Sequence, residues 1–427
     1  MQPINREIAA GIRLLALPQD RFTTAHITVA LAVPLADETA APNALLPGLL
    51  RRRCARYPDM SDLNRRLYAL YGAQVGGDIS AVGDKQVLVM SAGVIRDNCA
   101  LDGETPVGDT VAVLREILFR PYLENGRFSD EDLQIEKRCM VERIRAEIDE
   151  KRRYARRQAE EILCEGTACA VPLYGTEEQV EALTAAAVTE AWQTVLGTAE
   201  VQIILQGVDD PDAVADALVS ELAAFDRAPH SRGRMQAIAP RPLCRKTEEM
   251  ELNQCKLVMG LCGSIDPDDP QVPAVRLMNA VLGGTAHSLL FKHVREEQSL
   301  CYYCSSSYNR HKGILLIDSG VETAMVEKAE AEILKQLTAV QNGDFSDEEL
   351  ESAKRSLATH YDMTEDGQEE LSGWYVGQAL AADRVQTPAD AAADFVALTR
   401  EDVRAAAQRF TLGCVYLLKP DGKGEGV

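Results

Sequence analysis

Long apolar runs are missing from this sequence, and so is a secretory leader. No apolar run reaches the about 18 residues that a membrane-spanning helix needs. The N-terminal stretch MQPINREIAAGIRLLALPQD carries an acid early and lacks a basic segment followed by an apolar core. We therefore expect a protein that neither spans a membrane nor enters the secretory pathway, and we predict a cytoplasmic location.

Histidine is scarce and scattered, which argues against a resident metal. The chain has 427 residues and six histidines, which form no HExxH, HxxEH or HxH pattern. Their positions are His26, His230, His287, His293, His311 and His360. A GxSxG nucleophile motif is also missing, and LGGTAHS at 282–288 lacks the GxGxxG order of a phosphate-binding loop. We interpret LGGTAHS as a tight turn followed by the start of a helix.

Positive charge is in deficit, because 45 Lys and Arg residues face 66 Asp and Glu residues and the net charge is −21. Such a chain repels nucleic acid and anionic membranes on average. The basic run KRRYARR at 151–157 is an exception, but it lies among acids in a stretch that we predict to be one long helix. Mixed charge along a helix usually forms a solvated face, so we predict no nucleic-acid partner.

The eleven cysteines are an odd, scattered set, which is typical of a reducing compartment rather than of a disulfide framework. Cys301 and Cys304 form a CxxC pair, but no second CxxC completes a structural zinc site. The stretch CYYCSSSY is typical of a strand, and residues three apart on a regular strand point to opposite faces. We therefore expect Cys301 and Cys304 to be packing residues with no metal or redox role.

An internal repeat organises the chain. GRFSDEDLQIEKR at 126–138 and GDFSDEELESAKR at 343–355 each place a Gly-x-Phe, a serine and a run of acids before a helical pattern. Ser129 and Ser346 suit helix N-caps, and Ser346 with Glu349 makes an S-x-x-E capping box. Each copy therefore predicts a helix that begins in the same way.

Buried-strand patterns recur around the repeat. AHITVALAV at 25–33 matches CKLVMGLCG at 255–263, and VQIILQGVDD at 201–210 matches CVYLLKPDG at 414–422. Strands and helices are grouped more than they alternate, which favours α+β over a doubly wound parallel sheet. We predict two homologous α+β domains in tandem, each an antiparallel-rich sheet packed with helices.

The domain boundaries follow from composition. The segment 226–250 is rich in proline and basic residues and has little periodicity, as is typical of a linker. We predict an N-terminal domain at 1–225, an interdomain linker at 226–250 and a C-terminal domain at 251–427. The last residues, PDGKGEGV, are predicted to be a flexible tail.

The stretch LGGTAHSLLFKHVREEQSLCYYCSSSYNRHKGILLIDSG resembles the second domain of pitrilysin/insulinase-type zinc metallopeptidases. In the first half, PLYGTEEQVEALT at 172–184 is similar to another segment of that family. The residues that match in register are Leu282, Gly283, Gly284, Ser288, Leu290, Phe291, Val294, Arg295, Glu296, Leu300 and Tyr302. The resemblance covers nearly the whole chain. It implies two homologous domains that form half of a clam-like chamber, as in the mitochondrial-processing-peptidase-like bacterial subfamily.

The family's zinc motif is degenerate here. The stretch ALLPGLLRRRC at 44–54 stands where the resemblance implies two histidine ligands and a glutamate base. An ungapped match puts Leu45 and Leu49 at the ligand positions and Gly48 at the base, while the third ligand falls near Glu142 or Arg143. Leucine cannot bind zinc and glycine cannot abstract a proton. We expect no cofactor in this chain, apolar packing by the leucines, and a helix interrupted at Pro47 unless this proline lies in the first turn.

Arg295 and Tyr302 match the residues that, in the family, hydrogen-bond the substrate near the scissile bond. A guanidinium and a phenol can stabilise the negative charge that grows on a peptide carbonyl during attack by water. The resemblance therefore implies a catalytic and substrate-binding role for both. The alternative is structural: Arg295 pairs with Glu296 or Glu297 at the surface, and Tyr302 is a core aromatic.

These observations lead to one main hypothesis and two alternatives. The main hypothesis is a zinc-less subunit of a heterodimeric metallopeptidase, which positions a peptide or leader peptide for a homologous, zinc-bearing HxxEH partner and does not hydrolyse it alone. Edge-strand addition is the expected binding mode. The first alternative is a catalytically inactive structural or peptide-binding homologue. The second is a CxxC metalloprotein, which we do not expect.

Overall fold

The computed structural model describes residues 3–18, 20–231, 235–382 and 385–421. The chain forms two compact units. Unit 1 is drawn from Met1–Ile144, Val171–Gly233 and Gly367–Val385, and unit 2 from Arg145–Ala170, Arg234–Asp366 and Gln386–Val427. The predicted tail from 422 onward and residues 232–234 of the predicted linker lie outside the described residues.

Unit 1 is built on a six-stranded sheet with the order β1-β2-β8-β3-β5-β4. Its central strand β3 pairs antiparallel with β5 and β8, whereas β2 runs parallel to β8. The strands are β1 (Ile4–Ala9), β2 (Ile12–Leu17), β3 (Thr24–Pro34), β4 (Gln74–Val82), β5 (Lys85–Ile95) and β8 (Glu200–Gln206). The centre of the sheet is buried on both faces, since β3 is buried at every position between its two end residues.

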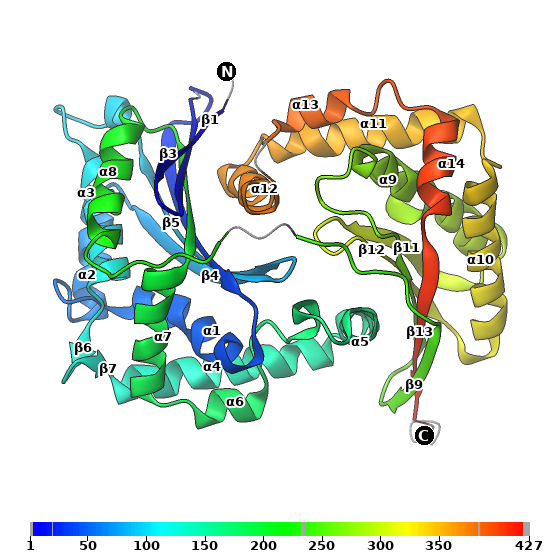
Figure 1. Ribbon diagram of the computed structural model, residues 1–427, viewed down its shortest axis with the longest axis horizontal. Helices are drawn as coiled ribbons and strands as arrows, with labels where there is room; N and C mark the ends of the chain where they lie inside the picture. Colours follow the sequence, from blue (N-terminus) through cyan, green and yellow to red (C-terminus); the bar gives the residue numbers. More distant parts are fainter. Residues whose placement is uncertain (1–2, 19, 232–234, 383–384, 422–427) are drawn as a thin grey trace. The chain divides into compact units, whose positions relative to one another are not determined.

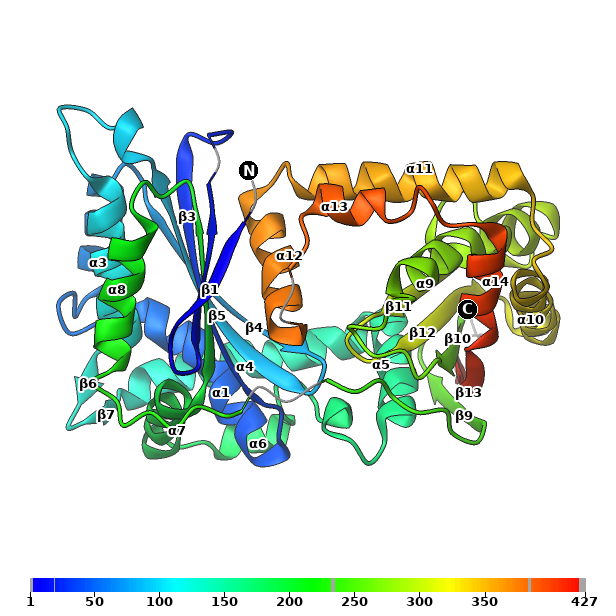
Figure 2. The same cartoon turned by 45° about the horizontal axis from the view of Figure 1, so that its top comes forward.

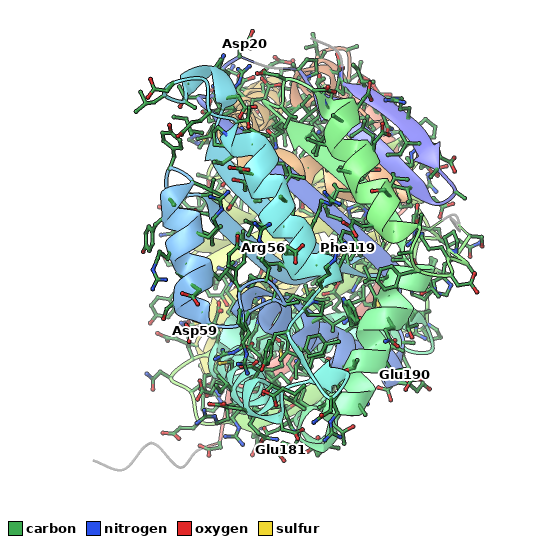
Figure 3. All side chains as sticks on the ribbon, turned by 90° about the vertical axis from the view of Figure 1, so that its left-hand side faces the viewer. Asp20, Arg56, Asp59, Phe119, Glu181 and Glu190 are labelled. Atoms are coloured by element: carbon green, nitrogen blue, oxygen red, sulfur yellow. The ribbon has the colours of Figure 1, made fainter. Side chains whose placement is uncertain are left out.

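Helices cover both faces of this sheet. On one face lie α3 and α8, and Figure 3 shows them beside α2, with Phe119 labelled at the end of α3. On the other face lies α12 (Figure 2). Ser372 of this helix accepts hydrogen bonds from Thr28 of β3 and Gln206 of β8. The helices of unit 1 are α1 (Asp37–Arg52), α2 (Met60–Ala69), α3 (Pro106–Phe119), most of α4 (Asp130–Asp149), α6 (Glu177–Ala182), α7 (Ala185–Thr198), α8 (Pro211–Leu222) and α12 (Gln368–Ala381). A short hairpin joins β6 (Leu123–Glu124) and β7 (Arg127–Phe128).

Unit 2 is built on a five-stranded sheet with the order β11-β12-β10-β13-β9. Strand β10 pairs antiparallel with β12 and β13, and β9 runs parallel to β13. The strands are β9 (Cys244–Met250), β10 (Cys255–Cys262), β11 (Cys301–Asn309), β12 (Ile314–Val321) and β13 (Thr411–Pro420). Strand β9 occupies the last residues of the segment 226–250, which the sequence presents as a linker.

One face of the unit 2 sheet is covered by α5 (Lys151–Cys164), which packs on β10, β12 and β13 (Figure 1). Ala155, Ala159 and Leu163 form the buried stripe of this helix. The helix approaches closely because Gly260 of β10 has no side chain: a Cβ there would lie 2.6 Å from Leu163. The remaining helices are α9 (Val272–Asn279), the wide turns η3 (Ala280–Gly284) and η4 (Leu290–Glu297), η5 (Thr323–Met325), α10 (Val326–Asn342), α11 (Asp347–Thr364), α13 (Pro388–Ala393) and α14 (Arg400–Gln408).

The two sheets share one topology, which confirms the predicted duplication and the α+β fold. From the edge strand inward, β4-β5-β3-β8-β2 corresponds to β11-β12-β10-β13-β9, with the same parallel pair at the end. The repeated helix starts are also present, because α4 begins at Asp130 and α11 at Asp347. Ser346 and Glu349 make the predicted capping box. None of the helices in the described part of the chain combines the length and apolarity that crossing a bilayer requires.

The two units exchange helices. In chain order α5 follows α4 of the first half but belongs to unit 2, and α12 follows α11 of the second half but belongs to unit 1. The prediction of one long helix here is wrong in one respect. Helix α4 ends at Asp149 and α5 begins at Lys151, because Glu150 between them is non-helical with φ −78° and ψ 81°.

The basic run on α5 is only partly the solvated face that its mixed charge predicts. Arg152 and Arg156 each donate a hydrogen bond of 2.5 Å to the carboxylate of Asp318, which lies on β12 and is 1% exposed. Arg153 instead pairs with Glu147 at the surface. Two arginines of KRRYARR thus fasten the helix to the sheet of unit 2, which is a structural role that the composition alone does not reveal.

Candidate functional site

Arg295 lies on η4, a short wide helix beside the edge of the unit 2 sheet. Its guanidinium carbon is 4.7 Å from the centre of the Phe291 ring, one turn earlier. Its Nε lies 3.5 Å from the Glu296 carboxylate, and the side chain is 42% exposed. Phe291 supports one face of the guanidinium through this cation–π contact.

Tyr302 lies on β11, the edge strand of the same sheet, and it owes its position to a β-bulge. Cys301 pairs with Val321 and Tyr303 pairs with Gly320, so Tyr302 is an extra residue that has no partner on β12. A bulge of this kind re-aims a side chain, and Tyr302 is 62% exposed. Its hydroxyl donates a hydrogen bond of 3.2 Å to Glu322. The alternative that Tyr302 is a core aromatic does not fit this exposure.

The structure brings Arg295 and Tyr302 together in one open pocket of about 440 Å³. Its lining includes Arg295, Glu296, Cys301, Tyr302, Glu322 and Met325. Glu322 and Met325 come from the end of β12 and from η5, and sequence reasoning missed both because nothing in their local pattern marks them. A guanidinium, a phenol, two carboxylates and a thiol in one cleft can hold a polar, extended ligand by hydrogen bonds.

The bulge also overturns the expectation that Cys301 and Cys304 point to opposite faces of the strand. Cys301 lies opposite Val321 and Cys304 opposite Ser319, and residues 319 and 321 share one face of β12. Cys301 and Cys304 therefore share that face as well, instead of pointing to opposite faces. The physical reason is the extra residue in the strand, which shifts the alternation of side chains by one.

The two thiols interact, and their acidities diverge. Hydrogen bonding from Cys304 to a Cys301 thiolate lowers the pKa of Cys301 to about 7 against the opposing effect of burial, with smaller contributions from Ser319 and the Arg295 charge. The same hydrogen bond and deep burial raise the pKa of Cys304 well above its usual range. Cys301 is thus the more ionised thiol of the pair, and it lines the pocket.

The positions that match the family's zinc motif lie on α1 and hold no metal ligand. Leu45 and Leu49 are buried in the core of unit 1, as predicted. At Gly48 a Cβ would lie 2.0 Å from the Glu136 carboxylate, which also accepts a hydrogen bond of 3.0 Å from Arg52. The place of the general base is therefore filled by a carboxylate that is already paired with a guanidinium.

The other predicted positions do not supply the missing ligands. Arg143 on α4 donates a hydrogen bond of 3.1 Å to Asp78 and lies over the Tyr174 ring. A guanidinium at this position repels a metal cation, and Glu142 is exposed. Within the described ranges, no three His, Cys, Asp or Glu residues gather as a metal site. The residues present do not fit a catalytic zinc ion.

The expectation that Pro47 interrupts the helix is wrong. Helix α1 runs from Asp37 to Arg52 with Pro47 well inside it. Proline there removes one backbone hydrogen bond, but Pro47 is buried against β4, where a Cβ on Gly77 would lie 3.3 Å from its ring. Close packing against a glycine therefore keeps the helix in place despite the missing bond.

Comparisons with known proteins agree with this geometry. Residues 182–357 match the family described as the peptidase M16 inactive domain. The chain is 28% identical to the probable inactive metalloprotease YmfF of Bacillus subtilis over 96% of both chains. The chain is thus similar to M16 peptidases over nearly its whole length. This confirms the resemblance to pitrilysin/insulinase-type enzymes, and it places the chain with relatives that are described as inactive.

Two further similarities complete the comparison. The uncharacterized zinc protease YmxG of Bacillus subtilis is 21% identical, over 70% of this chain and 71% of its own. A conserved protein from Enterococcus faecalis has the same fold, with a TM-score of 0.87 and 24% identity over 99% of this chain and 100% of the other. The fold of this neighbour thus extends over both units of the chain.

Proposed function

We propose that this M16-like chain binds extended peptide segments at the Arg295–Tyr302 pocket and does not hydrolyse them by itself. One observation carries the proposal. The two family-matched donors are solvent-accessible and line one pocket, whereas Leu45, Gly48 and Leu49 at the zinc-motif positions offer no ligand.

The edge strand supports the same proposal. Strand β11 ends the sheet order of unit 2, so one side of its backbone has no neighbouring strand in that sheet. A peptide that adds to such an edge gains backbone hydrogen bonds with little demand on its sequence. Arg295 and Tyr302 then contact peptide carbonyls near the start of β11. The net charge of −21 favours basic over acidic peptides at low salt.

Binding to fluorescent peptides of about 20 residues tests this proposal. The probes are one basic and one acidic peptide of equal length, measured by fluorescence anisotropy with the full chain. Changing Arg295→Ala together with Tyr302→Phe removes the donors, and we expect about tenfold weaker binding, which corresponds to about 1.4 kcal/mol. The matched control, Arg153→Ala with Tyr68→Phe, alters an exposed arginine and an exposed tyrosine outside the pocket. Equal losses in both double variants would refute the pocket as the binding site.

A second candidate function is the main hypothesis of the sequence, a subunit that assists a zinc-bearing homologue. One comparison favours it: Bacillus subtilis contains both a relative described as inactive and one described as a zinc protease. In such a pair the partner supplies the zinc and the general base. Arg295 and Tyr302 donate hydrogen bonds to the scissile carbonyl, and loss of one such donor costs about 10²–10³ in kcat.

Co-purification with a tagged copy from the native cell tests the pairing. An HxxEH-bearing homologue at equal stoichiometry, with peptidase activity that needs both chains, supports the assisting role. Activity of the reconstituted pair that survives both Arg295→Ala and Tyr302→Phe excludes catalytic assistance. Recovery of this chain without such a partner leaves peptide binding as its function.

A further inference from the structure

The bulge places the two cysteines of the CxxC pair on one face of β11. Cys301 and Cys304 lie opposite Val321 and Ser319, which are two residues apart on β12. These two positions of β12 are about 6.6 Å apart, at the upper end of the 4.4–6.8 Å between Cα atoms that disulfides accept. Closing the bond therefore requires the bulged segment to bring the two Cβ atoms to within about 4.5 Å of each other.

The two cysteines differ in access, which separates their chemical roles. Cys301 lines the Arg295–Tyr302 pocket, while Cys304 is only 5% exposed behind it. A reagent in the pocket meets Cys301 first. Cys301 is thus placed to attack the reagent, and Cys304 is placed to form the disulfide with the oxidised Cys301.

The surroundings of Cys301 favour its reactive form. The Arg295 cation and the Cys304 hydrogen bond both stabilise a thiolate at Cys301. Glu296 and Glu322 also line the pocket and oppose this effect, but they engage Arg295 and Tyr302 respectively. By contrast, burial raises the pKa of Cys262 to about 11 and that of Cys414 to about 12. Acidity of this kind is therefore not general among the cysteines of unit 2.

We propose that Cys301 and Cys304 form a reversible dithiol–disulfide site that reacts with peroxides entering the Arg295–Tyr302 pocket. The Cys301 thiolate attacks one peroxide oxygen, the O–O bond breaks, and hydroxide leaves and takes up a proton as water. The resulting sulfenic acid is attacked by the Cys304 sulfur, an S–S bond forms, and a second water leaves. In total two thiols and one hydrogen peroxide give one disulfide and two waters, and a dithiol reductant reverses the change.

Oxidation has a direct consequence for the pocket. The new bond joins the two residues that flank Tyr302 and Tyr303, so it closes a small ring around the bulge. The ring restrains the backbone that positions the Tyr302 side chain. The redox state of the pair therefore controls how freely Tyr302 moves at the mouth of the pocket.

The sequence provides a convenient readout. Trypsin cleaves after Arg295 and Arg310, and the peptide between these sites contains Cys301 and Cys304 as its only cysteines. The full-length reduced chain is treated with one equivalent of hydrogen peroxide at pH 7, blocked with N-ethylmaleimide, digested and analysed by mass spectrometry. We expect this peptide to lose two hydrogen atoms and to escape blocking, and dithiothreitol to restore both thiols. Exposed Cys99 and Cys139 serve as internal controls and remain fully blocked.

Two variants identify the roles. In Cys304→Ala, the sulfenic acid at Cys301 has no resolving thiol, so a dimedone adduct accumulates at Cys301. The alkylation rate of Cys301 at pH 7 should also fall roughly tenfold, because the hydrogen bond that favours its thiolate is lost. Oxidation of Cys99 or Cys139 at the same rate as Cys301, or a dithiol peptide that stays fully blocked, would overturn the proposal. These readouts do not depend on peptide binding, so the proposed function and the redox site can fail independently.

Discussion

Removing the negative charge of Asp318 should loosen α5 from the unit 2 sheet. Asp318→Asn keeps the volume of the side chain but leaves one acceptor oxygen where two oxygens each accept a 2.5 Å bond from a guanidinium. Hydrogen bonds to charged groups contribute about 1.5–3 kcal/mol each, and neutral ones about 1 kcal/mol. One bond is lost and the other becomes weaker.

The exposed fractions of the arginines set the size of the effect. Arg152 and Arg156 are 44% and 30% exposed, so each regains part of its hydration when the carboxylate is removed. The low end of the range therefore applies: about 1.5 kcal/mol for the lost bond and about 0.5 kcal/mol for the weakened one. We expect Asp318→Asn to lower the free energy of opening at α5 by about 2 kcal/mol, which is roughly a 30-fold change in the opening equilibrium.

Hydrogen exchange measured by mass spectrometry is the appropriate assay. Both tryptophans, Trp192 and Trp374, lie in unit 1, so tryptophan fluorescence does not report on unit 2. Amides of α5 should exchange roughly 30-fold faster in Asp318→Asn, with little change in α1 of unit 1. Arg153→Ala on the same helix is the control, because Arg153 is 62% exposed and pairs with Glu147 only at the surface. Equal protection of α5 in the wild type and in Asp318→Asn would show that the buried carboxylate does not hold this helix.

Three further predictions concern stability. Gly48→Ala should lower the free energy of unfolding by about 1–3 kcal/mol in urea titrations, because its Cβ collides with Glu136, whereas Gly108→Ala on α3 has open space and should be neutral or stabilising. Ser346→Ala removes a capping box and should cost about 1 kcal/mol, measured by faster exchange at the start of α11; unchanged exchange would contradict the cap assignment. Burial lowers the pKa of His311 to about 3, so the unfolded chain binds more protons than the folded chain between about pH 6.5 and pH 3. Stability should therefore fall as pH drops through this window, and His311→Gln should flatten the pH dependence of the urea midpoint.

The sequence predicts the duplicated fold well, because its signals are local. The repeated serine and acids before α4 and α11 mark helix starts, and the apolar runs of β3 and β10 mark central strands. Periodicity and capping depend only on neighbouring residues. The exchange of α5 and α12 between the units is a long-range property, and chain order alone assigns each helix to the wrong sheet.

The candidate site was predicted in part. Arg295 and Tyr302 follow from the family resemblance, and the structure places both at one pocket. Glu322 was missed because only the pairing of β11 with β12 brings it beside Tyr302. The prediction that Cys301 and Cys304 point to opposite faces is wrong for a similar reason, since a single bulge reverses the alternation that strand periodicity predicts. The pairing of β11 with β12, rather than the type of side chain, decides where Glu322, Cys301 and Cys304 lie.

The exchanged helices impose an order on synthesis. The sheet of unit 1 is covered on one face by α12, which the ribosome completes only at residue 381 of 427. Until then, Thr28 and Gln206 lack their partner Ser372, and that face of the sheet is exposed to water or to chaperones. A fragment that stops at the predicted domain boundary near residue 225 therefore lacks α12, which covers one face of its sheet. The sheet of unit 1 is therefore completed only after residue 381 has been made.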